Sequence, residues 1–226
     1  MQSTWKPSQL CLKEFVAGDH LSPTRAEGEP SVTQRVPAAR RSPTEQPMNN
    51  SASDLSTSVT TEAFAELWSA WLKIKHCLAQ LDDEQLWNRP DDDSNSIANL
   101  LLHLRGNLTQ WIISGFGRAP DTRDRPREFT ERGPVPRDAL IAGLEETIES
   151  AKRTLKSLDS AELVRRRRIQ GFDVPGTQAI FETVAHFRGH TQEIVHMTRR
   201  LLRHSYKFDF IPQTPEQGSP QDGLDA

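Results

Sequence analysis

The sequence predicts an all-α protein, a four-helix bundle preceded by a disordered N-terminal tail. In four long segments apolar residues recur three and four positions apart, the spacing that places them on one face of a helix. Strand-type alternation of polar and apolar residues is convincing only at residues 206–211, which we expect to form a docked extended tail. Four amphipathic helices of this length normally pack around one apolar core.

The helices are delimited by capping residues, glycines and polar segments. We expect the four helices at about 60–78, 96–114, 137–158 and 177–204. The polar, proline-rich stretch 118–135 reads as a long loop that allows one non-adjacent crossing, and residues 170–176 read as a shorter loop.

Both ends of the chain differ in composition from the middle. Residues 1–55 contain six prolines among serine, threonine, glutamate and arginine, with too little apolar surface to offset chain entropy. We therefore expect a disordered tail at 1–55, one domain at 56–217 and a disordered end at 218–226. Met48 offers an alternative for the tail, namely a start-site error with the true start at Met48, and both interpretations stay open.

Composition narrows the function classes. A net charge of −3 does not favour a nucleic-acid-binding protein, and no apolar run approaches the roughly 18–20 residues that span a membrane. Cys11 and Cys77 are too few and too distant for a disulfide framework, which favours the reducing cytoplasm. The basic run Arg165–Arg168 lacks interleaved aromatics, so we interpret it as a solvated segment facing the acidic clusters 82–84 and 91–93.

Three histidines form the most informative pattern. His186 and His190 are four residues apart in the fourth helix and therefore share a face, while His103 lies in the second helix. All three fall at the border of the apolar stripe of their helix, where a bundle has a seam open to water. Three neutral imidazoles there could hold a divalent metal ion with free coordination positions. The alternative is three separate histidines that hydrogen-bond within the bundle.

Other polar residues border the same seam. Asn107 follows His103 by one turn, Glu182 precedes His186 by one turn, and Glu193 lies three residues after His190. Each could orient a metal-bound imidazole, or one glutamate could act as a general base. The alternative is that both glutamates are ordinary surface residues, and we favour it for Glu193 because nearby arginines offer it surface ion pairs.

The segments SIANLLLHL (96–104) and AHFRGHTQEI (185–194) resemble the DinB-like (DinB/YfiT-like) superfamily, and residues 206–208 and 214–218 resemble a bacterial branch of it. The resemblance covers about residues 62–217. It implies an up-and-down four-helix bundle with a crossover, often homodimeric, and a divalent ion, zinc or nickel, held by His103, His186 and His190.

The resemblance also implies a range of activities. Some relatives are thiol S-transferases that use mycothiol, bacillithiol or glutathione, so we expect a metal-dependent enzyme that activates a thiol or water, as an S-transferase or hydrolase, against a small molecule. Arg105, Arg188 and the Arg165–Arg168 run are candidates for binding the carboxylates of such a thiol. Two alternatives stay open, a non-catalytic metal- or ligand-binding dimeric bundle in stress response and a purely structural bundle.

Overall fold

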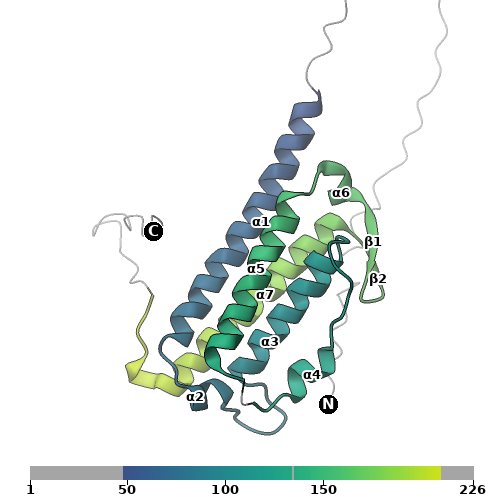
Figure 1. Ribbon diagram of the computed structural model, residues 1–226. Helices are drawn as coiled ribbons and strands as arrows, with labels where there is room; N and C mark the ends of the chain where they lie inside the picture. The colour runs from purple at the N-terminus through teal and green to yellow at the C-terminus, as the bar shows by residue number, and fades with distance from the viewer. Residues whose placement is uncertain (1–47, 134, 210–226) are drawn as a thin grey trace, which may run out of the picture. The chain divides into compact units, whose positions relative to one another are not determined.

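The computed structural model describes residues 48–133 and 135–209. Four long helices lie side by side in it (Figure 1). The elements in chain order are α1 (Met48–Leu78), α2 (Asp83–Trp87), α3 (Ile97–Leu108), the π-helical η1 (Thr109–Ser114), α4 (Arg125–Thr130), α5 (Arg137–Lys156), α6 (Ser160–Val164), β1 (Arg166–Ile169), β2 (Phe172–Pro175), α7 (Gly176–Leu202) and the 3-10 turn η2 (Arg203–Ser205). The predicted all-α bundle is confirmed for these residues.

The long helices form a closed ring of neighbours around one core. α1 packs on α5 and α7, and α3 packs on the same two helices, so α1 and α3 lie diagonally opposite and the chain crosses the bundle between them. The apolar stripes meet at its centre. Fully buried side chains there include Leu67, Trp71 and Ile74 of α1, Leu100 and Leu104 of α3, Leu144 and Ile148 of α5, and Ile180, Phe187 and Ile194 of α7.

α3 and α7 run in opposite directions, and this determines which residues of the two helices lie opposite each other around the histidines. α3 starts at a capping box in which Ser96 accepts from the Asn99 backbone N–H and the Asn99 side chain accepts in return. At the far end of this helix, in η1, the indole of Trp111 stacks on Phe172 and donates to Gln170, immediately before α7 begins. The end of α3 therefore lies beside the start of α7 (Figure 1).

α1 begins at Met48 and not near Thr60, so residues 48–55 are helical and the expectation of disorder was wrong for them. Pro47 ends the proline-rich stretch, and a helix already nucleated in the bundle extends back through residues of modest propensity. The hydroxyls of Ser56 and Thr60 bond to carbonyls of the preceding turn instead of breaking the helix. The expectations for 1–47 and 218–226 lie outside the described residues.

A β-hairpin stands where a basic run and a loop were expected. β1 and β2 pair antiparallel, with Arg166 opposite Pro175 and Ile169 opposite Phe172. Gln170 and Gly171 both have positive φ, at 52° and 86°, as a tight two-residue hairpin turn requires. Ile169 and Val174 are buried beneath the hairpin, and Phe172 stacks on Trp111. The sequence did not predict this hairpin because three of the four residues of β1 are arginines, so the strand shows no alternation of polar and apolar residues.

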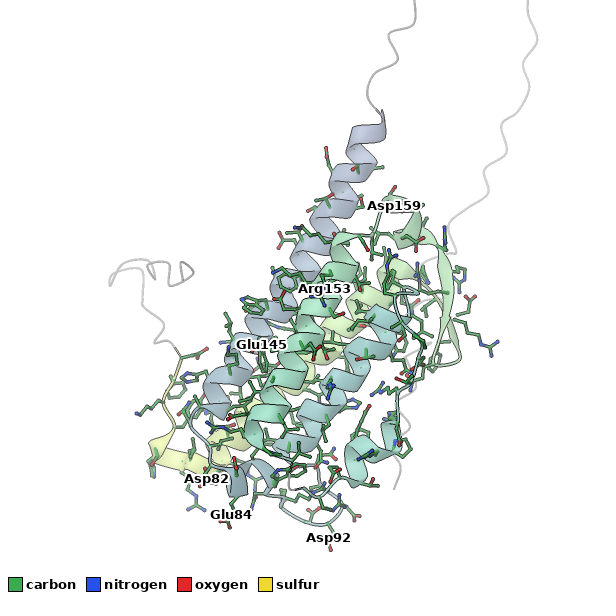
Figure 2. All side chains as sticks on the ribbon, in the orientation of Figure 1. Asp82, Glu84, Asp92, Glu145, Arg153 and Asp159 are labelled. Carbon is green, nitrogen blue, oxygen red and sulfur yellow. The ribbon has the colours of Figure 1, made fainter. Side chains whose placement is uncertain are left out.

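The arginines of this run pair locally and not with the acidic clusters. Arg165 and Arg167 form ion pairs with Glu162, and Arg166 pairs with Asp173 at 2.8 Å. Figure 2 shows Asp82, Glu84 and Asp92 at the end of the bundle near α2, whereas the hairpin lies towards the opposite end. The prediction that the basic run faces the acidic clusters 82–84 and 91–93 was wrong, because the two kinds of segment lie towards different ends of the helices.

The stretch expected to be an open loop contains α4. Asp124 caps this short helix by accepting from the Arg127 backbone N–H, and Pro126 stands in its first turn, where the missing N–H has no cost. α4 packs against α3. Among the described helices, none combines the length and apolar character that crossing a bilayer requires.

Candidate metal centre

The structure brings His103, His186 and His190 together between α3 and α7. Their imidazole rings lie with centroids 4.5–5.0 Å apart, and His103 Nε2 lies 2.9 Å from His186 Nε2. One nitrogen from each ring falls within 4.8 Å of the others. The two α7 histidines are one turn apart on the same face, and His103 reaches them from the facing helix.

This arrangement fits a small divalent ion. Nitrogens bound to one tetrahedral zinc at about 2.0–2.1 Å lie about 3.3 Å from each other. The present separations, from 2.9 Å to at most 4.8 Å, span that value. An imidazole set suits zinc, nickel, copper or iron, and three ligands leave coordination positions open.

Glu128 of α4 holds the ring of His103. Its Oε2 lies 2.8 Å from His103 Nδ1, so the Nδ1–H donates to the carboxylate and Nε2 is left facing the other histidines. The Glu128 carboxylate in turn accepts a bidentate pair of hydrogen bonds from one edge of the Arg123 guanidinium, with Nε donating to Oε1 at 2.6 Å and Nη2 donating to Oε2 at 2.8 Å. Arg123 also donates to Gln110 of η1. Such a carboxylate partner is the usual support of a metal-binding imidazole.

The buried charges of this group compensate each other. Burial opposes ionisation of Glu128, but hydrogen bonds from Arg123 and His103 outweigh it and hold the pKa of that carboxyl below its usual range. Burial also lowers the pKa of His103, more strongly than Glu128 raises it. Burial, followed by the neighbouring His190 and His103, lowers the pKa of His186 to about 3. His103 and His186 are therefore neutral near pH 7, which is the form that binds metals.

A glycine makes room for the carboxylate. Gly106 lies on the face of α3 that Glu128 and Arg123 cover, and a methyl group there would overlap Glu128 Oε1 and come within 2.9 Å of Arg123 Nε. The end of α4 is fixed to the start of α3, because the Asn99 side-chain amide donates to the carbonyls of Glu128 and Glu131. The same residue that caps α3 therefore positions Glu128.

His190 has a carboxylate partner on its own helix. Its Nδ1 lies 2.7 Å from Glu193 Oε2, so Nε2 is the ring nitrogen left available to a metal. The interpretation of Glu193 as an ordinary surface residue was therefore wrong. Its side chain is 46% exposed, but it also bonds one of the three rings.

Asn107 and Glu182 border the cluster without contacting its rings through any hydrogen bond recorded among the described residues. Glu182 Oε1 accepts from Gln178 one turn earlier in α7, at 2.7 Å. Its Oε2 and the Oδ1 of Asn107 are buried and have no hydrogen-bond donor among the described residues. Neither residue supports an imidazole in the way that Glu128 and Glu193 do.

The arginines expected to recognise a thiol's carboxylates lie elsewhere. Arg105 packs against Gly143 of α5, Arg188 pairs with Glu66 of α1, and the basic run forms the hairpin. Arg123 and Arg125 are instead the cations whose charge acts on His186.

Sequence reasoning missed Glu128 and Arg123 because the segment that carries them reads as a loop. The Asp-Arg-Pro sequence at 124–126 is a helix-start signal within it. That signal could have indicated a short helix, although not the side of the bundle on which it packs.

The comparisons with known proteins agree with this architecture. The model of the family described as Protein of unknown function (DUF1572) matches residues 54–215. A solved structure of a conserved protein from Enterococcus faecalis is similar at 16% identity and a TM-score of 0.54, over 64% of this chain and 97% of that one. A DinB-like protein from Bacillus cereus is similar at 17% identity and a TM-score of 0.49, over 61% and 90%. No curated protein matches the chain.

At such identities the Enterococcus structure supports the fold alone, whereas the family match spans most of the chain. DUF1572 is a DinB-like family, so the resemblance read from residues 96–104 and 185–194 is confirmed. The chain belongs to this family of DinB-like proteins, DUF1572.

Proposed function

We propose that the protein binds one divalent metal ion, zinc or nickel, through His103, His186 and His190. The observation that carries this proposal is the convergence of three imidazoles, two of which are held by carboxylates at Nδ1 so that Nε2 is left available to a metal. A merely structural histidine cluster has no need of this common orientation.

We further propose a metal-dependent reaction on a small molecule, of the thiol S-transferase or hydrolase type. A bound ion with open positions lowers the pKa of a thiol or water and so supplies a nucleophile near neutral pH. The protein's own part is to keep His103 and His186 neutral through burial and to orient His103 through the Glu128–Arg123 pair. The side chain of His190 is 23% exposed, so the cluster is in contact with solvent.

The proposal extends to the cellular location, the oligomeric state and the ligand of the protein. Cys77 is a free, buried thiol, which fits a reducing compartment, and we propose the cytoplasm as the location. We also propose a homodimer, to be checked by light scattering. The ligand we expect is a low-molecular-weight thiol.

Metal content measured by inductively coupled plasma mass spectrometry tests the first proposal. We expect about one divalent ion per chain in the wild type and almost none in His186→Ala. His196→Ala is the matched control, because His196 lies exposed on α7 and away from the cluster. A wild type that stays metal-free after incubation with zinc and nickel would contradict the proposal.

Turnover separates the enzyme from a non-catalytic metal-binding bundle. The metal-loaded protein is mixed with a thiol and an electrophile such as 1-chloro-2,4-dinitrobenzene, and thioether formation is followed by absorbance. A rate above background that His186→Ala abolishes supports the enzyme. Metal binding with no activity towards any thiol or hydrolysable ester supports the non-catalytic alternative.

A further inference from the structure

Asn107 and Glu182 lie on the same side of the histidine cluster, one turn away from it on facing helices. Asn107 follows His103 by four residues in α3, and Glu182 precedes His186 by four residues in α7. Because the two helices are antiparallel and touch at His103 and His186, both steps lead towards the η1 end of the bundle. Each step is about 6 Å along the helix axis.

Both residues present buried oxygens that no group of the described residues satisfies. Asn107 is 8% exposed, and its Oδ1 has no donor among the residues that the structure describes. Glu182 Oε1 accepts from Gln178, but its Oε2 is buried and equally without a protein donor within the described chain. A buried acceptor left unpaired costs about 1–3 kcal/mol, so such groups normally have a partner. Both lie one helical turn from the cluster on facing helices, which makes them candidates to share one partner.

We propose that Asn107 Oδ1 and Glu182 Oε2 accept hydrogen bonds from the donor group, an amine or hydroxyl, of a small molecule whose other end lies at the histidine cluster. This inference rests on the proposed function and names the chemical class of its ligand.

The charges around the cluster rank the possible donor groups. Glu128 is neutralised by Arg123, so its charge is already compensated. Among the described residues, Glu182 has only the neutral amide of Gln178 as a hydrogen-bonding side-chain partner. A charged ammonium forms a stronger hydrogen bond to a carboxylate than a hydroxyl does, and a methyl group forms none. A ligand ending in a carboxylate would instead meet two acceptors and is disfavoured.

An isosteric series of thiols tests the proposal. Cysteamine, 2-mercaptoethanol and 1-propanethiol differ only in ending in an ammonium, hydroxyl or methyl group, and 3-mercaptopropionate ends in a carboxylate. Each is titrated into protein loaded with Co²⁺, and binding is followed by the thiolate-to-cobalt charge-transfer absorbance. The readout is the affinity of each thiol relative to 1-propanethiol, compared between wild type and variants, so that the differing acidities of the thiols cancel.

In Glu182→Gln we expect the relative affinity for cysteamine to fall about 10- to 100-fold, the loss expected for one charged hydrogen bond. In Asn107→Leu we expect the relative affinities for cysteamine and 2-mercaptoethanol to fall about 5- to 10-fold. Glu149→Gln, at an exposed ion pair with Lys152 on α5, is the matched control and keeps the wild-type ratios. The relative affinity for 3-mercaptopropionate rises in Glu182→Gln.

A structural role for the two residues makes the opposite prediction for stability. If the two oxygens serve to bind a ligand, Glu182→Gln and Asn107→Leu leave the melting temperature of the ligand-free protein unchanged or raise it. The reason is that each substitution removes an unpaired buried acceptor. A fall in both variants, with thiol ratios unchanged, overturns the inference and makes the residues part of the packing.

The outcomes separate this inference from the function on which it rests. Protein that binds no cobalt contradicts the metal site and the ligand assignment together. Protein that binds cobalt and all four thiols, with ratios that Glu182→Gln and Asn107→Leu do not change, keeps the metal site and refutes only the role of these two residues.

Discussion

Glu128 decides how His103 is presented. A free imidazole exchanges its proton between two nitrogens, and only the deprotonated one can bind a metal. The carboxylate fixes the proton on Nδ1, and Arg123 keeps the carboxylate ionised although it is buried. The pair also keeps the buried charge of Glu128 compensated, as a low-dielectric environment requires.

Replacing Glu128 by glutamine keeps its shape but removes the charge and one strong acceptor. We expect Glu128→Gln to weaken zinc binding about 10- to 100-fold, the usual effect of losing such a partner. Competition with a chromophoric chelator measures it. Glu149→Gln, whose side chain forms an exposed ion pair on α5, should bind zinc as the wild type does. Equal affinity in both variants would show that Glu128 supports only the fold.

The lowered pKa of His186 predicts how the metal-free protein responds to acid. The pKa is about 3 in the folded chain, chiefly because of burial, and about 6.5 in an unfolded chain. Between these values the unfolded chain binds a proton that the folded chain does not. The free energy of unfolding is therefore fully retained above about pH 6.5 and falls as the pH decreases towards 3, by up to about 1.4 kcal/mol per pH unit for one histidine.

Urea unfolding of chelator-treated protein between pH 7 and pH 5 measures this slope. His103, whose pKa is also lowered, acts in the same direction. Glu128 contributes little there, because its pKa lies below the ordinary carboxyl range. His186→Gln should reduce the dependence of the unfolding free energy on pH by up to the contribution of one proton, about 1.4 kcal/mol per pH unit. A slope that the substitution does not change would mean that His186 is protonated in the folded protein.

Two glycines of the long helices provide a matched pair of substitutions. Gly106 is covered by Glu128 and Arg123, whereas a methyl group at Gly189, between the two α7 histidines, meets nothing within 4 Å. Alanine favours a helix by about 0.8–1 kcal/mol over glycine. Gly189→Ala should therefore stabilise the protein by up to that amount and leave zinc affinity unchanged.

At Gly106 the same substitution should act on the site. The new methyl group displaces the Glu128 carboxylate from His103, so we expect zinc affinity to fall about tenfold or more in Gly106→Ala, with little gain in stability. Chelator competition and thermal unfolding of the two variants measure both effects. If Gly106→Ala binds zinc as tightly as Gly189→Ala, the carboxylate can support His103 from another position.

The elements that the sequence predicts well are those with many apolar contacts. Each long helix carries a stripe of several buried residues, such as Ile180, Phe187 and Ile194, which repeats often enough to be read. The β-hairpin buries only two apolar side chains, Ile169 and Val174, and α4 buries even fewer. Such short elements depend on tertiary packing, so their sequences contain turn and cap signals but no periodicity.

In the candidate site, too, the histidines on long helices could be predicted from the sequence, and the residues in and beside a short element could not. The helical repeat and the border positions were enough to indicate that His103, His186 and His190 could meet. The partners Glu128 and Arg123 come from a segment whose position depends on Asn99 and on the space at Gly106. Such a long-range arrangement leaves no periodic trace in one sequence. Glu193 was misjudged because a half-exposed glutamate near arginines is usually a surface residue.

For the molecule as a whole, the proposed ion would join helices that are distant in sequence. His103 belongs to α3 and the other two ligands to α7, so one ion bridges neighbouring helices that are separated in the chain by α4, α5 and the hairpin. The unfolded chain holds these histidines apart and binds the ion weakly. A ligand that binds only the folded state stabilises it, by about 2.7 kcal/mol at a hundredfold excess over its Kd.

In a chain of this size about 1 kcal/mol changes the melting temperature by roughly 2–4 °C, so zinc at that excess should raise it by roughly 5–10 °C. Differential scanning calorimetry of chelator-treated protein, with and without zinc, measures the shift. His186→Ala should show almost none, while His196→Ala should respond as the wild type does. An equal shift in His186→Ala would mean that zinc acts at another site, since the proposed site has lost one of its three ligands in this variant.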